Sequence, residues 1–153
     1  MKKTILVFLF AVGFYATEAQ ELVWTNSLDK AIDISSKTNK PIMLFFTGSD
    51  WCGWCKRLQN EVFKQPEFVA WAKNNVVLME VDFPKSTSLP EDIKEQNGKL
   101  QQFFGVSGFP TVWLVNAKKT ENNINFEKLG NTGYVAGGPN AWLEVANGIL
   151  KKK

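Results

Sequence analysis

Residues 45–58 read Phe45-Phe46-Thr47-Gly48-Ser49-Asp50-Trp51-Cys52-Gly53-Trp54-Cys55-Lys56-Arg57-Leu58 and contain both cysteines of the chain. An apolar run gives way to a helical pattern here, which predicts a helix that begins at Cys52. A sulfur at that point lies near unpaired backbone N–H groups and the positive end of the helix dipole, which favour its thiolate. Cys52 is therefore the candidate nucleophile. Cys55, almost one turn later, is the candidate resolving thiol that can close a disulfide with it.

The N-terminal residues 1–19 have the three parts of a secretory signal peptide. Two lysines precede an apolar run from Ile5 to Ala16, and a short stretch of small and polar residues leads to Ala19. The apolar run is shorter than the roughly 20 residues that a helix needs to span a bilayer. The sequence therefore predicts a signal peptide over 1–19, cleaved after Ala19, and a periplasmic or secreted protein. An uncleaved anchor or a buried first strand is the alternative.

The whole chain has the composition of one globular domain, which we expect over residues 20–153. Hydrophobic residues make up 44% of the sequence, with 12 Phe and 6 Trp, which is typical of a folded core rather than of a disordered segment. The net charge is only +3, and the basic residues are scattered apart from three lysines at the C-terminus. We therefore expect no nucleic-acid partner.

Other uses of the two cysteines conflict with the rest of the sequence. A tetrahedral zinc site needs four ligands, yet the chain has 2 Cys and no His, so we expect no metal. The lack of histidine also excludes a Cys–His hydrolase, and Lys56 after Cys55 excludes the c-type haem motif, so we expect no cofactor. A structural disulfide is common in exported proteins, but closing so short a loop constrains the unfolded chain little. Redox chemistry is the better interpretation.

The apolar pattern predicts alternating strands and helices. Ile42 to Phe46 has no polar interruption, as in a strand buried on both faces, and another apolar strand follows the helix that begins at Cys52. This order predicts a parallel crossover, with the cysteines at the carboxyl end of the first strand. The other predicted elements are a helix from Thr25 or Asn26 to about Lys37, a helix over 67–74, a strand over 76–81, a helix capped by Ser88 with Glu91, a strand over 111–115, a polar turn over 117–123, a strand over 124–129 and a helix from Gly137 with Trp142, Val145, Ala146 and Ile149 on its inner side.

Two motifs in this order resemble those of the thioredoxin family. One is Trp51-Cys52-Gly53-x-Cys55-Lys56 after an apolar strand, and the other is Gly108-Phe109-Pro110-Thr111 before the next-to-last strand. The similarity runs from about Leu22 to Leu150 and looks closest to exported bacterial thioredoxin-like proteins, including the thioredoxin-like domain of thiol:disulfide interchange proteins. It implies an α/β chain with the thioredoxin fold, a central mixed β-sheet flanked by helices.

The resemblance also implies roles for single residues. Cys52 matches the attacking cysteine of the family, and Cys55 matches the resolving one. Pro110 matches the family's cis-proline, which lies against the disulfide. The residue before it, Phe109, offers backbone hydrogen bonds to a bound peptide, and Trp51 matches the flanking aromatic residue.

The chain departs from the family pattern at two positions. Phe46 stands where many thioredoxins carry a buried Asp that helps to move a proton from the resolving thiol. Trp54 stands in place of the common Pro between the cysteines, where residues tune the reduction potential in this family. Together with Trp51 and Phe109, Trp54 is expected to form an apolar rim that binds an extended substrate. For Trp51 a packing role is the equal alternative.

The sequence thus predicts an exported, reductase-like thiol:disulfide oxidoreductase that acts through Cys52 and Cys55. Its expected substrate-binding residues are Trp51, Trp54, Phe109 and Pro110. We expect a monomer that acts on protein thiols or disulfides in the cell envelope, and a reductase there would need a membrane protein as electron donor because the compartment is oxidising. The alternative is a non-catalytic thioredoxin-fold binding module, or a holdase for unfolded peptide, in which the cysteines are a passive clip.

Overall fold

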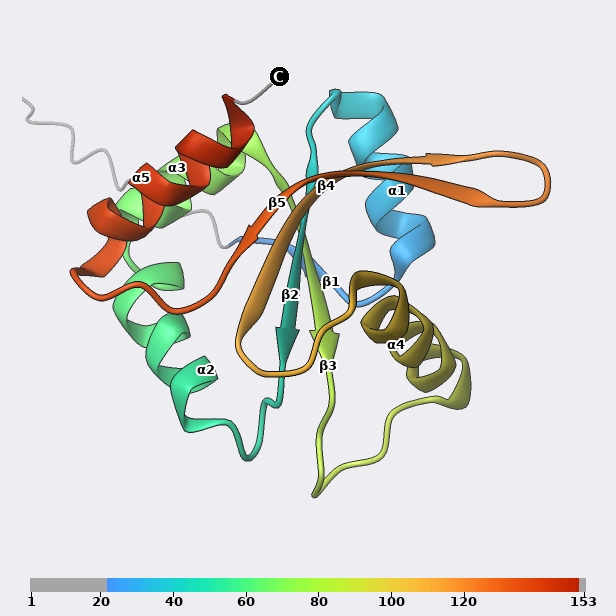
Figure 1. Cartoon of the computed structure of the whole chain (residues 1–153), viewed down its shortest axis with the longest axis horizontal. Coiled ribbons are helices and arrows are strands. Elements are labelled where there is room, and N and C mark those ends of the chain that lie inside the picture. The colour runs from blue at the N-terminus through green and yellow to red at the C-terminus, as the bar shows by residue number, and fades with distance from the viewer. Residues whose placement is uncertain (1–21, 152–153) are drawn as a thin grey trace, which may run out of the picture.

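The computed structural model describes residues 22–151, and the predicted signal peptide over 1–19 lies outside this range. The described chain forms one sheet of five strands. Helices flank this sheet on both faces, as predicted (Figure 1). None of its helices within residues 22–151 has the length and apolar character needed to cross a bilayer. The elements in chain order are β1 (Trp24–Thr25), α1 (Leu28–Thr38), β2 (Ile42–Thr47), α2 (Gly53–Leu58), the π-helix η1 (Gln59–Phe63), α3 (Pro66–Asn75), β3 (Val77–Asp82), α4 (Glu91–Phe104), β4 (Thr111–Lys119), β5 (Ile124–Thr132) and α5 (Gly138–Leu150).

The sheet is mixed, with its strands in the order β1-β3-β2-β4-β5. Strands β1, β3 and β2 run parallel, whereas β4 is antiparallel to β2 and β5 is antiparallel to β4. The parallel pairing joins Thr47 of β2 to Asp82 of β3, which confirms the predicted parallel crossover. Strand β4 begins at the same edge, because Thr111 pairs with Phe46. The segments after β2 and β3 and the segment before β4 therefore meet at one edge of the sheet.

Each face of the sheet buries its own hydrophobic cluster. Helices α1 and α4 cover one face, and α2, η1, α3 and α5 cover the other (Figure 1). Successive residues of β2 alternate between the two faces, as the period of a strand requires. Leu44 and Phe46 lie on the α1 and α4 side, whereas Met43 and Phe45 lie on the other. Because both faces are covered, β2 contains no polar residue before Thr47.

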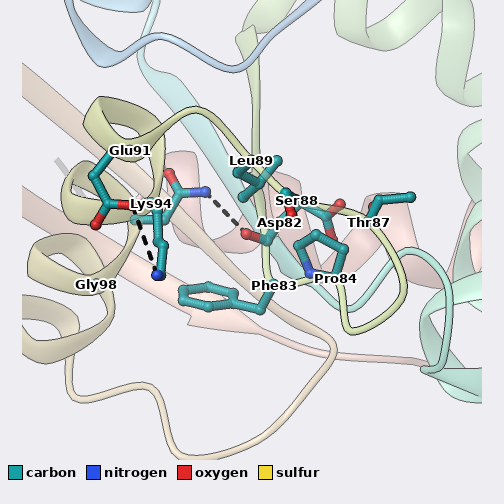
Figure 2. Close-up of a pocket in the computed structure, with 10 residues that line it drawn as sticks. Asp82, Phe83, Pro84, Thr87, Ser88, Leu89, Glu91, Lys94 and Gly98 are labelled. Carbon is teal, nitrogen blue, oxygen red and sulfur yellow. Dashed lines mark hydrogen bonds and ion pairs between the residues drawn. The ribbon is translucent and has the colours of Figure 1, made fainter.

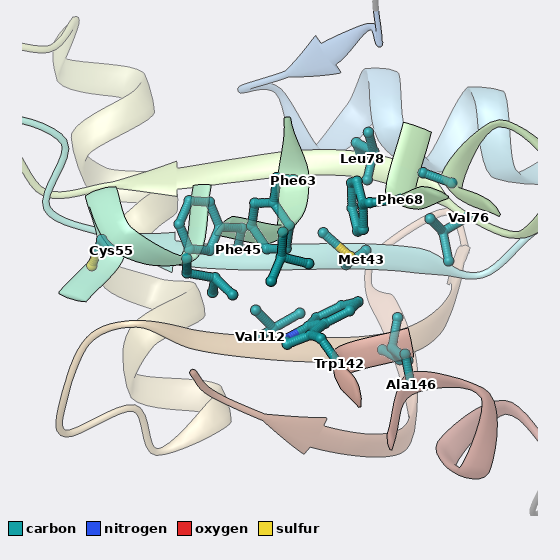
Figure 3. Close-up of a cluster of buried hydrophobic side chains, with 14 of the residues drawn as sticks. Met43, Phe45, Cys55, Phe63, Phe68, Val76, Leu78, Val112, Trp142 and Ala146 are labelled. Carbon is teal, nitrogen blue, oxygen red and sulfur yellow. The ribbon is translucent and has the colours of Figure 1, made fainter. Parts of the chain in front are cut away.

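Phe63 of η1 lies among several aromatic rings on the α2, α3 and α5 face (Figure 3). Its ring centroid is 5.1 Å from that of Phe45, 4.6 Å from Phe68 and 5.5 Å from Trp142. Aromatic rings stabilise one another at separations of roughly 4.5 to 7 Å, in addition to the apolar area that they bury. The same cluster contains both cysteines, so the motif is packed against the core of the domain.

Two helices begin later than the sequence pattern predicts. The N-cap of α1 is Ser27, whose Oγ accepts a hydrogen bond from the backbone N–H three residues later, so the predicted cap at residues 25–26 is wrong. The chain is still paired with β3 at residue 25, and it can turn into the helix only after that point. Helix α4 begins after Pro90 with no side-chain cap, so the predicted capping by Ser88 with Glu91 is also wrong.

The hairpin of β4 and β5 is longer than the sequence pattern predicts. Strand β4 continues past Val115 to Lys119, and Ala117 pairs with Phe126 of β5. The predicted polar turn over 117–123 is therefore too long. The first residues of the predicted turn belong to β4 although some of them are polar. The hairpin extends beyond the core of the sheet, and there both faces of its two strands can be exposed to solvent (Figure 1).

Helix α5 begins at Gly138 and packs on the sheet through Trp142 and Ala146, as predicted. Ile149 is partly buried against the same cluster. Val145 is exposed, so its predicted inner position is wrong. It lies one residue from Ala146, about 100° around the helix, and this rotation turns its side chain away from the sheet.

Candidate active site

The two cysteines lie just beyond the carboxyl end of β2, at the start of α2. A disulfide joins them, with their Cα atoms 5.3 Å apart. Cys52 is the N-cap residue of α2, because its Sγ accepts a hydrogen bond from the backbone N–H of Cys55 at 3.2 Å. The predicted helix start is thus confirmed. Cys52 is 5% exposed and Cys55 1%, so Cys52 is the more accessible residue, and it lies where backbone N–H groups favour negative charge.

The loop between β2 and Cys52 is fixed by the neighbouring strand. Ser49 donates its backbone N–H to Oδ1 of Asp82 at 2.8 Å and its hydroxyl to Oδ2 at 2.5 Å. The backbone N–H of Cys52 donates to the carbonyl of Gly48 at 2.8 Å. A Cβ atom at Gly48 would overlap the ring of Trp51, so glycine leaves the room that this ring occupies. The Asp82 carboxylate therefore positions the segment that leads into the cysteines.

Asp50 connects the same loop to the segment that follows β3. Its carboxylate accepts hydrogen bonds from the backbone N–H groups of Ser86 at 2.5 Å and Lys85 at 3.0 Å. These bonds, that from Ser86 first, lower the pKa of Asp50 against the opposing effect of desolvation. Lys56 donates its ammonium to the backbone carbonyl of Asp50 at 2.9 Å. The charge of Lys56 is thus bound to this loop.

Replacing Asp50 by Asn is expected to lower stability at neutral pH but not in acid. The folded-state pKa of Asp50 lies below its ordinary value of 3.8, so its stabilising effect is present above that pH and is lost as the pH falls through the folded-state pKa. Urea unfolding followed by circular dichroism should show a lower midpoint for D50N than for wild type at about pH 7, and this difference in midpoint should disappear below about pH 3. Glu121→Gln, at the exposed turn between β4 and β5, is the matched control and should leave both midpoints unchanged. An equal difference in midpoint between wild type and D50N at both pH values would contradict a stabilising role of the Asp50 charge.

Three aromatic side chains form a continuous surface next to the cysteines, here called the aromatic rim: Trp51, Phe109 and Phe83. The ring centroid of Phe109 is 5.8 Å from that of Trp51 and 5.3 Å from that of Phe83. Trp51 donates its Nε1–H to the backbone carbonyl of Phe83 at 2.8 Å and is 41% exposed. The peptide bond between Phe109 and Pro110 is cis, as the family resemblance implies. The rim therefore joins the motif, the segment after β3 and the segment before β4.

Trp54 lies in a different environment, against Tyr134 in the segment between β5 and α5. The two ring centroids are 5.2 Å apart, and the guanidinium of Arg57 lies 5.2 Å from the Trp54 ring and 5.0 Å from the Tyr134 ring. Glu61 accepts hydrogen bonds from Arg57 at 2.6 Å and from the Tyr134 hydroxyl. These two bonds, that from Tyr134 first, lower the pKa of Glu61. The network fixes the ring of Trp54, which remains 55% exposed.

The structure thus divides the predicted apolar rim into two parts. Trp51 and Phe109 lie together, whereas the ring beside Trp54 is that of Tyr134. The sequence interpretation did not include Phe83 or Tyr134. The position of Phe83 directly after an apolar strand that ends at the same edge as the cysteines is a signal that could have indicated it. No comparable signal precedes Tyr134, which is far from the motif along the chain.

The pair of cysteines can take up two electrons as a disulfide and release them as a dithiol. Within residues 22–151, no three His, Cys, Asp or Glu side chains gather in a group that could hold a metal ion. The groups that the structure brings together at this edge of the sheet are the two sulfur atoms, the N-terminus of α2 and the aromatic side chains beside them.

Comparison with known sequences agrees with this geometry. A family model described as a thioredoxin-like domain matches residues 28–124. The disulfide bond reductase DsbH of Chlamydia pneumoniae is 37% identical over 119 residues, which cover 77% of this chain and 71% of DsbH. The thioredoxin-related protein DsbJ of Chlamydia pneumoniae is 28% identical over 125 residues, which cover 78% of this chain but only 36% of DsbJ.

Comparison with solved structures gives the same result for the fold. A structure of a DsbH oxidoreductase superimposes with a TM-score of 0.78 and 30% sequence identity, covering 96% of both chains. A thioredoxin from Thermus thermophilus superimposes with a TM-score of 0.63 and 16% identity, covering 86% of this chain and 88% of that one. The second match concerns the fold alone. Together the two matches confirm the predicted thioredoxin fold.

Proposed function

Because the chain belongs to the thioredoxin-like family and is a thiol:disulfide oxidoreductase, we propose that it is an exported, reductase-like member that exchanges disulfides with proteins of the cell envelope. In this proposal Cys52 attacks the substrate and Cys55 resolves the intermediate. The substrate polypeptide lies over the aromatic rim and the peptide bond before Pro110, and Trp54 contacts it from the other side of the motif.

The proposed cycle begins with both cysteines reduced. The Cys52 thiolate attacks one sulfur of a substrate disulfide; a mixed disulfide forms, and the other substrate sulfur leaves as a thiolate that takes up a proton. The thiol of Cys55 then loses its proton and attacks Sγ of Cys52. This step releases the second substrate thiol and leaves the Cys52–Cys55 disulfide. The substrate gains two electrons and two protons, which an electron donor must later restore to the protein.

The position of the disulfide supports this proposal most directly. Its more accessible residue caps α2 at the edge of the sheet where three chain segments meet, next to an exposed aromatic surface. A disulfide that served only to constrain the chain would not need this position, and its loop is too short to have much effect on the unfolded state. The relative DsbH is named a disulfide bond reductase, which supports the reductase direction.

Export is proposed from the sequence of residues 1–19, with its basic start, short apolar run and small residues before Ala19. An exported protein meets an oxidising compartment, where substrate disulfides are available and no cytosolic thiol pool reduces the protein. We therefore propose a membrane protein as the electron donor and protein disulfides of the cell envelope as the substrates.

One measurement tests both export and direction. Cells that make the protein are quenched with acid, their proteins are then denatured and alkylated at neutral pH with a thiol reagent, and the protein is purified and its mass determined. We expect the mass of residues 20–153 with two alkyl groups, because the signal peptide has been removed and a reductase is kept with Cys52 and Cys55 as thiols. The mass of residues 1–153 would contradict cleavage. A cleaved protein that carries no alkyl group would contradict the reductase direction and favour an oxidase.

A further inference from the structure

A cavity of about 550 Å³ lies between α4 and the segment that joins β3 to α4 (Figure 2). Its walls include Phe83, Pro84 and Leu89 from the segment and Gly98 from the helix. Phe83 also belongs to the aromatic rim, where its ring lies 5.3 Å from that of Phe109. One side chain therefore lines both the cavity and the surface beside the cysteines.

The charged groups around the cavity already make contacts within the protein. Lys94 and Glu91 lie 3.7 Å apart at its edge, and the Asp82 carboxylate accepts both hydrogen bonds from Ser49. The side-chain amide of Asn97 donates to the backbone carbonyl of Asp82 at 2.9 Å. Asp82, Glu91 and Lys94 are thus already engaged in contacts within the protein. The surface left for new contacts is mostly apolar, and burying apolar surface is favourable without a specific partner group.

The cavity lies next to the place where the substrate must bind, because Phe83 lines the cavity and also packs against Phe109. A mixed disulfide brings a substrate cysteine to within bonding distance of Cys52, next to Trp51. From the Trp51 ring, two ring-to-ring steps of 5.8 and 5.3 Å lead across Phe109 to Phe83. An extended polypeptide advances about 3.3 to 3.6 Å per residue, so about three residues cover this path. A side chain at that distance from the substrate cysteine can reach the cavity.

We propose that this cavity binds a large apolar side chain of the substrate polypeptide, about three residues from the cysteine that forms the mixed disulfide. The proposal rests on the proposed function, because the occupant is part of a disulfide substrate. The apolar side chain packs against Phe83, Pro84 and Leu89 and orients the polypeptide across the aromatic rim. The protein thus selects its substrates by a side chain that takes no part in the exchange itself.

Gly98 provides a test that leaves the cysteines untouched. A Cβ atom there would meet nothing within 4 Å, and leucine has a higher helix propensity than glycine. Gly98→Leu therefore places an apolar side chain at the wall of the cavity. Gly148→Leu is the matched control, because Gly148 also lies in a helix, has the same open surroundings and lines no part of this cavity. Leu89→Ser is a second variant, which removes an apolar wall instead of filling the space.

The substrates are extended peptides joined through their cysteine to glutathione, with either Leu or Ser at the positions two to four residues from that cysteine. Wild-type protein and G148L are expected to reduce the Leu peptides at least about tenfold faster than the Ser peptides. This ratio of rates corresponds to the free energy gained when a leucine side chain is buried. G98L and L89S are expected to lose this preference while they reduce oxidised glutathione, which is too short to reach the cavity, as fast as wild type.

The outcomes distinguish a failure of the cavity's role from a failure of the proposed oxidoreductase function. Equal rates on Leu and Ser peptides in wild type, or a preference that survives in both G98L and L89S, would overturn the role of the cavity and leave the oxidoreductase function in place. A wild-type protein that reduces none of the disulfides, glutathione included, would overturn the proposed function and the role of the cavity with it. Circular dichroism of each variant shows that the fold is retained.

Discussion

Replacing Cys52 by serine is expected to reduce disulfide exchange to the uncatalysed background. A serine hydroxyl at the N-cap of α2 still accepts the backbone hydrogen bond that Cys52 Sγ accepts, so the helix start is preserved. The hydroxyl is not ionised near neutral pH and forms no disulfide with a substrate, so the first bond of the cycle cannot form. The measurement is the rate at which the reduced protein generates free thiols from a protein disulfide, with wild type and C52S at equal concentration.

Cys55→Ser is the matched variant, because it also removes the disulfide but keeps the attacking sulfur. We expect C55S to form a covalent complex with its substrate that persists on a non-reducing gel, since no second thiol displaces the first. C52S should form no such complex. Equal exchange rates in wild type and C52S would contradict the assigned roles and would favour a binding module in which the cysteines are a passive clip.

Trp142→Ala is expected to have the largest effect on stability of any single change away from the cysteines. Trp142 is completely buried, its ring lies 5.5 Å from that of Phe63 and 5.6 Å from that of Phe68, and its Nε1–H donates to the carbonyl of Gly133 at 3.1 Å. Removing so large a side chain leaves a void and an unpaired carbonyl, and changes of this kind cost about 3 to 5 kcal/mol. Domains of this size have a free energy of unfolding of only about 5 to 15 kcal/mol, so the loss is a large fraction of the total stability.

Trp54→Ala is the control for this change, since it removes the same side chain from a position that is 55% exposed. We expect it to lower the free energy of unfolding by about 1 kcal/mol or less, through the lost contacts with Tyr134 and Arg57. Urea unfolding followed by circular dichroism gives both values. A loss for Trp142→Ala no greater than that for Trp54→Ala would contradict the central place of Trp142 in the core.

The sequence predicts the fold well because its strongest signals are local. The unbroken apolar run of β2 indicates a strand covered on both faces, and the change to a helical pattern at Cys52 places the cysteines at the strand's carboxyl end. Both features depend on residues next to one another in the chain. The Gly108-Phe109-Pro110-Thr111 motif then fixes where β4 begins relative to the cysteines, because Thr111 pairs with Phe46.

The surroundings of the site are less predictable because they depend on pairs of residues far apart in the chain. Asp82 binds Ser49 across 33 positions, and Tyr134 binds Glu61 across 73. Each of these side chains is polar or amphipathic and would be equally acceptable in an exposed turn, so nothing in its own neighbourhood indicates the contact. The sequence therefore places Trp54 in a substrate-binding rim but gives no sign that its ring packs against Tyr134 and Arg57.

Phe109 packs against the hydrophobic clusters on both faces of the sheet. The residue that is expected to receive the substrate backbone is thus supported by two sets of helices at once, and melting of either set would displace it. Heating that melts either helical layer should therefore abolish turnover, so the temperature at which turnover is lost reports the less stable of the two layers. Variants that weaken either helical layer can be ranked by their thermal inactivation alone.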